Sequence, residues 1–142
     1  PYTQISESKA LWQVNGQASC SFTILPGNYY IELKHRSGLE TWSVSPVTFG
    51  GTSVSYNFTN AANKAYASNQ VEVQSGIWAM YAGDLYTDGN VDLLDYSELE
   101  YGISNFLFGY EAGDINGDGN VDLLDSSILE TNMMNFIYSI LP

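Results

Sequence analysis

The residues best placed to do chemistry lie between 114 and 125, in the stretch Asp-Ile-Asn-Gly-Asp-Gly-Asn-Val-Asp-Leu-Leu-Asp. Side-chain oxygens fall at positions 1, 3, 5, 9 and 12 of this loop, and Gly119 stands at position 6. Ca²⁺ binds about six to eight hard oxygens, and loops with this spacing supply them from those positions and from the position-7 carbonyl. Glycine permits the sharp turn that such a loop needs. The sequence therefore predicts a calcium site here.

A second loop of the same length begins thirty residues upstream and runs from 84 to 95. It matches the later loop at each oxygen-bearing position except position 3, where Tyr86 stands in place of an asparagine. We expect two calcium ions, the one in the first loop bound more weakly, with water replacing the missing oxygen. The predicted metal ligands are Asp84, Asp88, Asn90, Asp92 and Asp95 in the first loop, and Asp114, Asn116, Asp118, Asn120, Asp122 and Asp125 in the second.

The likeness between the two stretches continues beyond the loops. Leu99, Glu100, Asn105 and Phe106 recur as Leu129, Glu130, Asn135 and Phe136. A repeat of this quality over about 26 positions indicates one duplicated supersecondary unit. Apolar residues follow each loop at i, i+4 and i+7, first as Leu99, Ile103 and Phe106 and then as Leu129, Met133 and Phe136. This spacing predicts one short helix after each loop, with the two apolar faces packed together. Val91 and Val121, at position 8, are expected to join the loops to each other by a short β-bridge.

Paired loops with Asp at position 12, each followed by one helix and preceded by none, resemble the dockerin module over residues 83–138. The resemblance implies two half EF-hands and a cohesin-like partner. Residues 29–36, 40–43, 56–58 and 65–66 resemble a β-domain found before dockerin-type repeats at the C-termini of large secreted bacterial proteins. In such relatives a further strand usually precedes the equivalent of Pro1-Tyr2, so we expect an open sheet edge in this chain.

The stretch before the first loop has the pattern of β-structure. Apolar residues alternate with polar ones over 18–24 and 29–35, and further runs of this kind are 41–49, 53–58, 70–74 and 77–82, with 9–14 a weaker candidate. Short strands separated by Gly, Ser and Asn favour an antiparallel β-sandwich. Residues 60–69 lack a period and predict a crossover loop with one helical turn. We therefore predict an α+β chain, with a β-sandwich over 1–82 and a helical, dockerin-like calcium module over 83–142.

The net charge and the cysteine content limit which partners, disulfides and locations are compatible with this sequence. A formal charge of −12 with four lysines and arginines argues against nucleic acid and anionic membranes as partners. Half of the sixteen acidic residues lie in the loops, and two Ca²⁺ ions of +2 each would bring −12 to −8, so calcium is expected to assist folding. The single cysteine, Cys20, excludes an internal disulfide. No apolar run reaches the roughly 18 residues of a membrane span. Low cytosolic calcium favours an extracellular or cell-surface location, for a mature product or a cut fragment.

Catalysis is not expected. The loop carboxylates are assigned to calcium rather than to a hydrolytic dyad, and full coordination leaves no open position on the metal. No nucleophile, base and orienting group can be combined from the remaining side chains. His35 alternates with charged neighbours on a predicted strand and is interpreted as structural. Cys20 falls on the apolar register of its strand and is expected to be a small buried hydrophobe. Asn57 begins a glycosylation sequon.

Two leucine pairs and the aromatic residues are candidates for a surface that binds a partner. Leu93-Leu94 and Leu123-Leu124 occupy loop positions 10 and 11, where cellulosomal dockerins contact cohesin, and they either enter the helix core or form a repeated apolar patch. Three tryptophans and eleven tyrosines suit a contact surface. Three functions compete: self-assembly into a filament, tube or surface layer through an open β edge and the calcium module, docking to a cohesin-like protein, and carbohydrate binding. We favour self-assembly, with copies of the same chain as partners.

Overall fold

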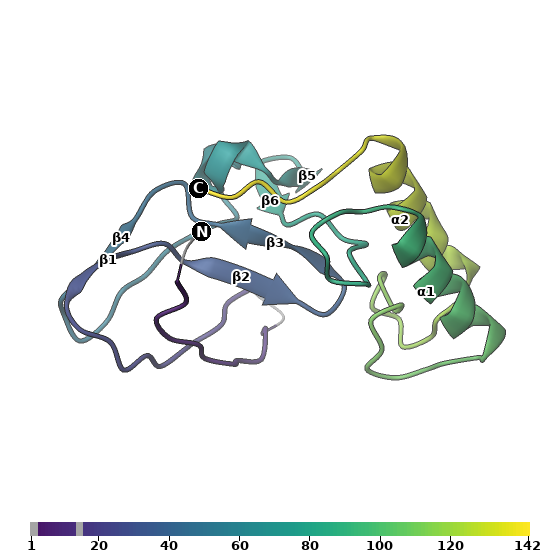
Figure 1. Ribbon diagram of the computed structural model, residues 1–142, viewed down its shortest axis with the longest axis horizontal. Helices are drawn as coiled ribbons and strands as arrows, with labels where there is room; N and C mark the ends of the chain where they lie inside the picture. Colours follow the sequence, from purple (N-terminus) through teal and green to yellow (C-terminus); the bar gives the residue numbers. More distant parts are fainter. Residues whose placement is uncertain (1–2, 14–15) are drawn as a thin grey trace.

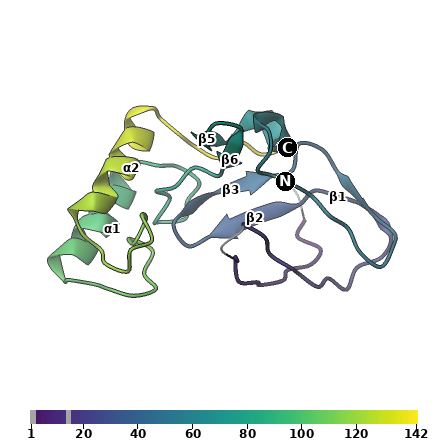
Figure 2. The same cartoon turned by 180° about the vertical axis from the view of Figure 1, so that it is seen from behind.

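The computed structural model describes residues 3–13 and 16–142. Within these residues, six short strands in antiparallel pairs come before two helices, which confirms the predicted α+β class (Figure 1). The helices stand side by side at one end of the molecule and the strands occupy the rest, and Figure 2 shows the same division from behind. None of the described helices has the length and apolar character needed to cross a membrane.

The strands form separate two-stranded ladders. The pairs are β1 (Gly27–Tyr29) with β4 (Val47–Phe49), β2 (Glu32–His35) with β3 (Gly38–Trp42), and β5 (Val71–Gln74) with β6 (Ile77–Ala79). The last two are hairpins of neighbouring strands, and each contains a register shift. Two 3₁₀ turns, η1 (Ala62–Lys64) and η2 (Tyr66–Ser68), fill the crossover predicted over 60–69. Short ladders of this kind do not confirm the two packed sheets of the predicted β-sandwich.

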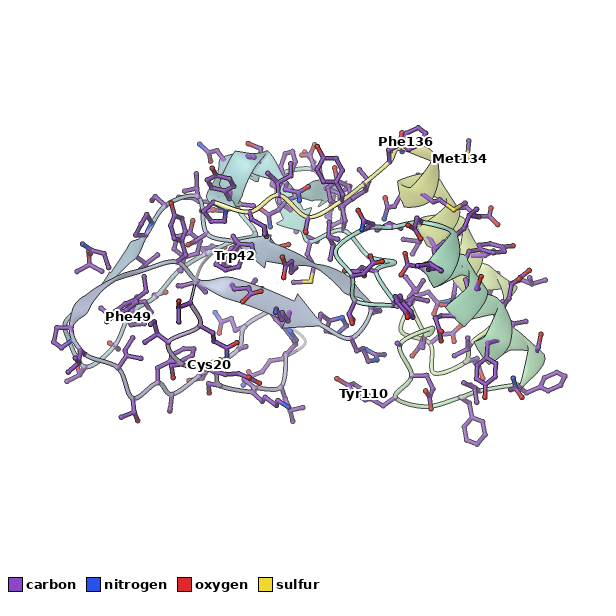
Figure 3. All side chains as sticks on the ribbon, viewed as in Figure 1. Cys20, Trp42, Phe49, Tyr110, Met134 and Phe136 are labelled. Carbon is purple, nitrogen blue, oxygen red and sulfur yellow. The ribbon has the colours of Figure 1, made fainter. Side chains whose placement is uncertain are left out.

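Two predicted strands, over 18–24 and 53–58, form no ladder with any other described residue. In the described part of the chain, no main-chain N–H to C=O hydrogen bond reaches either stretch, and we call them the unpaired segments. Alternation shows which side chains share a face, but a ladder also needs a neighbouring strand in register. Cys20 lies on the first unpaired segment and is exposed, so its predicted burial is wrong (Figure 3). The weaker candidate strand is absent over 9–13, while Val14 and the Pro1-Tyr2 edge lie outside the described residues.

The helices α1 (Leu93–Ser104) and α2 (Leu123–Met134) pack against each other. The buried core beneath them consists of Leu39, Val91, Leu99, Val121 and Leu129. Leu39 belongs to β3, whereas the other four come from the loops and helices. Burial of an aliphatic side chain of this size stabilises a fold by about 1.5–3 kcal/mol. The strands and the helices therefore share one apolar core.

Each helix ends before the third residue of its predicted apolar face. The Phe106 N–H donates to the Ile103 carbonyl (3.1 Å) and the Leu107 N–H to the Gly102 carbonyl (3.0 Å), the paired bonds of a Schellman ending. This ending sets Phe106 at a φ of 52° and turns its side chain outward, where it is 84% exposed. Phe136 repeats this arrangement. The predicted packing of both phenylalanines is therefore wrong, and the residues that follow them, Leu107 and Ile137, pack on the core instead.

Candidate metal centre

Each predicted calcium loop pairs with a segment that follows a helix, and not with the other loop. The Val91 N–H donates to the Ile137 carbonyl (2.9 Å), and the Val121 N–H donates to the Leu107 carbonyl (3.0 Å). The predicted bridge between the two valines is therefore wrong. Each valine pairs instead with a residue that follows a helix. This happens because the Schellman ending reverses the chain, so that the next residues run antiparallel to position 8 of a loop. Both valines instead fill the common core.

Glycines shape both loops. Gly89 and Gly119, at position 6, have φ values of 86° and 90°, the left-handed conformation that the predicted sharp turn requires. Gly83 and Gly113 stand immediately before the loops, and a Cβ atom would lie 3.1 Å from a methyl of Val91 at the first and 2.8 Å from the equivalent methyl of Val121 at the second. Sequence reasoning missed this second pair, although their spacing of thirty residues was the available signal.

The first loop holds two carboxylates away from water. Asp84 and Asp95 are 3% and 1% exposed. Asp84 accepts hydrogen bonds from the backbone N–H groups of Asp88 (3.1 Å) and Gly89 (3.2 Å). Asp95 accepts from the N–H of Tyr86 (2.9 Å) and from that of Asp92 (2.8 Å). These bonds fix the carboxylates of positions 1 and 12 at the base of the loop.

The second loop repeats this arrangement. Asp114 and Asp125 are 5% and 0% exposed. Asp114 accepts from the N–H groups of Gly117 (2.9 Å) and Gly119 (3.2 Å). Asp125 accepts from those of Ile115 (2.8 Å), Asn116 (2.9 Å) and Asp122 (3.0 Å). The repeat therefore extends to the hydrogen bonds of the predicted ligands.

Positions 9 and 12 of each loop also begin the helix that follows. Asp92 caps α1 by accepting from the Leu94 N–H (2.8 Å), while Asp95 accepts from the N–H of Asp92, so the two form a capping box. Asp122 and Asp125 do the same for α2. Carboxylates in a first helical turn also interact favourably with the helix dipole. These four residues therefore stabilise the starts of the helices, in addition to their proposed role as metal ligands.

The remaining predicted ligands lie at the solvent side. Asp118 accepts from the backbone N–H of Asn120 (2.9 Å) and from its side-chain amide (3.2 Å), and this N–H group is the main reason that the pKa of Asp118 is lowered. In the first loop, Asp88 likewise accepts from the backbone N–H of Asn90 (2.9 Å) and from its side-chain amide (3.1 Å). Asn116 accepts from the Asp118 N–H (2.8 Å). Each loop thus has a carboxylate pair inside and acid and amide oxygens outside.

The first loop has uncompensated negative charge. Burial, and next the charge of Asp95, raise the pKa of Asp84 to about 6. Burial likewise raises the pKa of Asp95, although three backbone N–H groups lower it. Among residues 3–13 and 16–142, no lysine or arginine forms an ion pair with this loop. A buried carboxylate pair without a cation destabilises the structure around it.

The second loop has a cationic neighbour, Arg36, from the turn between β2 and β3. Its guanidinium Nη2 lies 3.6 Å from Oδ2 of Asp114, and its Nε–H donates to the Glu111 carbonyl (2.8 Å). The guanidinium carbon also lies 4.2 Å from the ring centre of Tyr110, which points outward beside the loop in Figure 3. Sequence reasoning missed Arg36, because no local pattern relates it to a loop more than seventy residues away.

A metal ion needs several donor groups close together. In the described part of the chain, no three acidic, histidine or cysteine side chains come together as a group that could hold an ion. Loops with this spacing, however, also bind through amide and main-chain carbonyl oxygens and through water. All the predicted side-chain donors are oxygens, the ligand type of Ca²⁺ and Mg²⁺ rather than of zinc or copper. The chemistry of the residues therefore fits a hard divalent cation.

The leucines at positions 10 and 11 do not enter the core. All four, Leu93, Leu94, Leu123 and Leu124, are exposed, so the interpretation that they enter the helix core is wrong. Leu93 lies beside Met133 and Met134 of the other helix in a shallow hollow of about 250 Å³. Figure 3 shows Met134 and Phe136 projecting together from the end of α2.

No protein-family model, curated protein or solved structure matches this chain. The resemblance to dockerin modules therefore rests on the spacing of the two loops, their glycines and the helix after each of them.

Proposed function

We propose that this chain is a non-catalytic, extracellular calcium-binding protein that assembles with copies of itself. The β unit, residues 1–82, would form the contact as an incomplete β-sandwich. The calcium unit, residues 83–142, would be a dockerin-like module stabilised by two ions. The single observation that carries the proposal is a cavity between the two unpaired segments.

This cavity of about 1030 Å³ lies in the β unit. Cys20, Phe22 and Ile24 line it from the first unpaired segment, and Val54, Tyr56 and Phe58 line it from the second. Both segments leave main-chain N–H and C=O groups without ladder partners in the described part of the chain. Free backbone groups beside apolar side chains are what an added β-strand binds: the backbone supplies hydrogen bonds and alternate side chains enter the hollow.

The lack of charge around the cavity favours another copy as the source of that strand. No charged residue occurs from 10 to 31 or from 41 to 63, in a chain with a net charge of −12. The charged residues that line the cavity, Glu32 and Lys34, form an ion pair with each other (2.9 Å). Two copies repel elsewhere but can approach here, where each offers a neutral segment. Strand addition of this head-to-tail kind produces a filament when the contact does not close into a ring.

Sedimentation of the protein with saturating calcium tests the proposal. We expect large species that dissociate when a peptide with the sequence of residues 18–25 is added. Val54→Lys places a charge in the cavity and should leave the protein monomeric. Val73→Lys, at an exposed valine of β5, is the matched control and should not affect assembly. A wild-type protein that stays monomeric at every concentration, with no response to the peptide, would contradict self-assembly.

Docking to a cohesin-like partner remains a second candidate, because Phe106 and Phe136 occupy an unusual place. Both have a φ of 52° at a helix ending where glycine is usual, and they are 84% and 83% exposed. Large residues that are strained and also exposed favour a role in contact over one in folding. The double variant Phe106→Gly with Phe136→Gly should raise the melting midpoint, because glycine relieves the strain at both positions, but it should lose capture by immobilised cohesin domains. Wild-type protein that is not captured by such domains would contradict docking.

A further inference from the structure

The turn between β2 and β3 contacts the approach to both predicted calcium loops. The Ser37 carbonyl accepts from the Gly83 N–H (2.7 Å), one residue before the first loop begins. On the other side, the Nε–H of Arg36 donates to the carbonyl of Glu111 (2.8 Å), three residues before the second loop. Gly38 of β3 also forms a β-bridge with Ala82. The turn is therefore one of the places where the β unit contacts the calcium unit, and it lies next to both loops.

Arg36 reaches further than this backbone contact. Its Nη2 lies 3.4 Å from the carbonyl oxygen of Asp114 and 3.6 Å from the carboxylate Oδ2 of the same residue. The Tyr110 ring lies against the guanidinium, and the Arg36 side chain is 20% exposed. A guanidinium held by a carbonyl, a carboxylate and an aromatic ring has a defined position. Asp114 holds position 1 of the second loop, so the cation sits beside a proposed calcium ligand.

In the described part of the chain, the first loop has no equivalent of this contact. Thirty residues before Tyr110 and Glu111 stand Met80 and Tyr81, and the Tyr81 carbonyl accepts from the backbone N–H of Leu39. Lys34, two residues before Arg36, forms ion pairs with Glu32 and Glu40 on the strands. Among the described lysines and arginines, Arg36 is thus the one that forms an ion pair with a predicted ligand.

We propose that Arg36 is a positioning residue that acts as a built-in cation for the second loop, compensating Asp114 when calcium is absent and opposing the ion when calcium binds. The inference rests on the proposed calcium binding. A guanidinium and a divalent ion that share one carboxylate repel each other, so each weakens the other's hold. Linkage makes this effect reciprocal. The factor by which Arg36 lowers the calcium affinity of the second loop is also the factor by which bound calcium weakens the contact between the β2–β3 turn and the calcium unit. The occupied and empty loops would then differ in how firmly the β unit is held.

The test is Arg36→Gln, with Lys34→Gln as the matched control. Both are made in an Asp84→Asn background, which leaves the second loop as the only predicted site with all its carboxylates. Calcium affinity is measured by titration calorimetry, and melting midpoints are measured in chelator and in saturating calcium. Arg36→Gln should bind calcium about tenfold more tightly, because one repelling charge is removed. Its midpoint should fall in chelator, and calcium should raise it by more than in the parent protein. Lys34→Gln should match the parent in both respects.

A purely structural role for Arg36 would have a different signature. It would lower both midpoints equally and leave the affinity unchanged or weaker, and that result would overturn the inference. Arg36→Lys keeps the charge but loses the Nε–H bond to Glu111, so it should retain the parent's calcium affinity. If Arg36→Gln is too unstable to titrate, its melting midpoints decide: a calcium-induced rise larger than that of the parent protein supports the inference, and an equal or smaller rise overturns it. Absence of any calcium response in the wild-type protein would overturn the calcium proposal itself, so the two failures are distinguishable.

Discussion

Thr87 and Gly117 hold the same place, the fourth position, in the two repeated loops, and both have a left-handed backbone, with φ values of 56° and 80°. Glycine adopts this conformation freely, whereas a β-branched residue is strained in it. Strain of this kind amounts to about 1–3 kcal/mol per residue. The first loop therefore carries a backbone penalty that the second lacks, and we expect this penalty and the missing oxygen at Tyr86 to weaken its proposed calcium site relative to that of the second loop.

Thr87→Gly should therefore raise the free energy of unfolding by about 1 kcal/mol, since relief of strain exceeds the entropy that glycine adds to the unfolded chain. Urea denaturation in chelator measures the change. The reverse substitution in the other loop, Gly117→Thr, should lower the free energy of unfolding. A loss of stability in Thr87→Gly would show that the threonine side chain contributes more than the strain costs.

Removal of calcium should destabilise the wild-type protein strongly, because a ligand bound only to the folded state stabilises it. The effect is about 2.7 kcal/mol per site when free calcium is 100 times Kd. Differential scanning calorimetry in excess chelator and in millimolar calcium measures the difference in midpoint. Sodium chloride at equal ionic strength is the control for simple screening of charge. Equal midpoints in chelator and calcium would contradict a structural role for the ion.

The position-1 aspartates should respond in opposite directions to removal of charge. In chelator, Asp84→Asn should stabilise the protein, because the charge of Asp84 is buried beside Asp95 without a cation. Asp114→Asn should destabilise it, because Arg36 loses its anionic partner. Each effect is expected at about 1 kcal/mol. Thermal melts of the two variants measure this, and changes of the same sign in both would contradict the assigned asymmetry.

Stability without calcium should rise as the pH falls from 7 towards 5. The pKa of Asp84 in the folded protein is raised to about 6, above the ordinary value of 3.8, so between these values the folded state binds more protons than the unfolded state. Stability therefore falls as the pH rises through this window. The raised pKa of Asp95 acts in the same direction, while the lowered pKa of Asp118 acts oppositely and at lower pH. Melts from pH 4.5 to 7 should show the trend in wild type and a weaker one in Asp84→Asn.

Leu39→Ala should destabilise the calcium unit as well as the strand that carries it. Leu39 is fully buried against the core residues of loops and helices, and truncation of such a leucine costs about 2–5 kcal/mol. Leu11→Ala, at an exposed leucine, is the control. Far-ultraviolet circular dichroism reports the helices of the calcium unit during melting. A helix signal whose midpoint is unchanged in Leu39→Ala would show that the two units melt independently.

The sequence alone determined the features that depend on local spacing. The turns at Gly89 and Gly119, one helix after each loop, the crossover over 60–69 and the α+β class all follow from residues a few positions apart. The placement of carboxylates at positions 1 and 12 inside the loops has the same origin, because a twelve-residue loop that leads into a capped helix has few ways to close.

The tertiary structure decided which of these local units meet. It placed the position-8 valines beside the segments after the helices, left 18–24 and 53–58 without ladders, and brought Arg36 to Asp114. It also turned Phe106 outward, because a left-handed residue at the helix ending reverses the chain. Periodicity identifies residues that share a face, but it carries no information about what lies opposite that face. Contacts across seventy or more residues depend on the packing of the whole chain around Leu39 and the helix core.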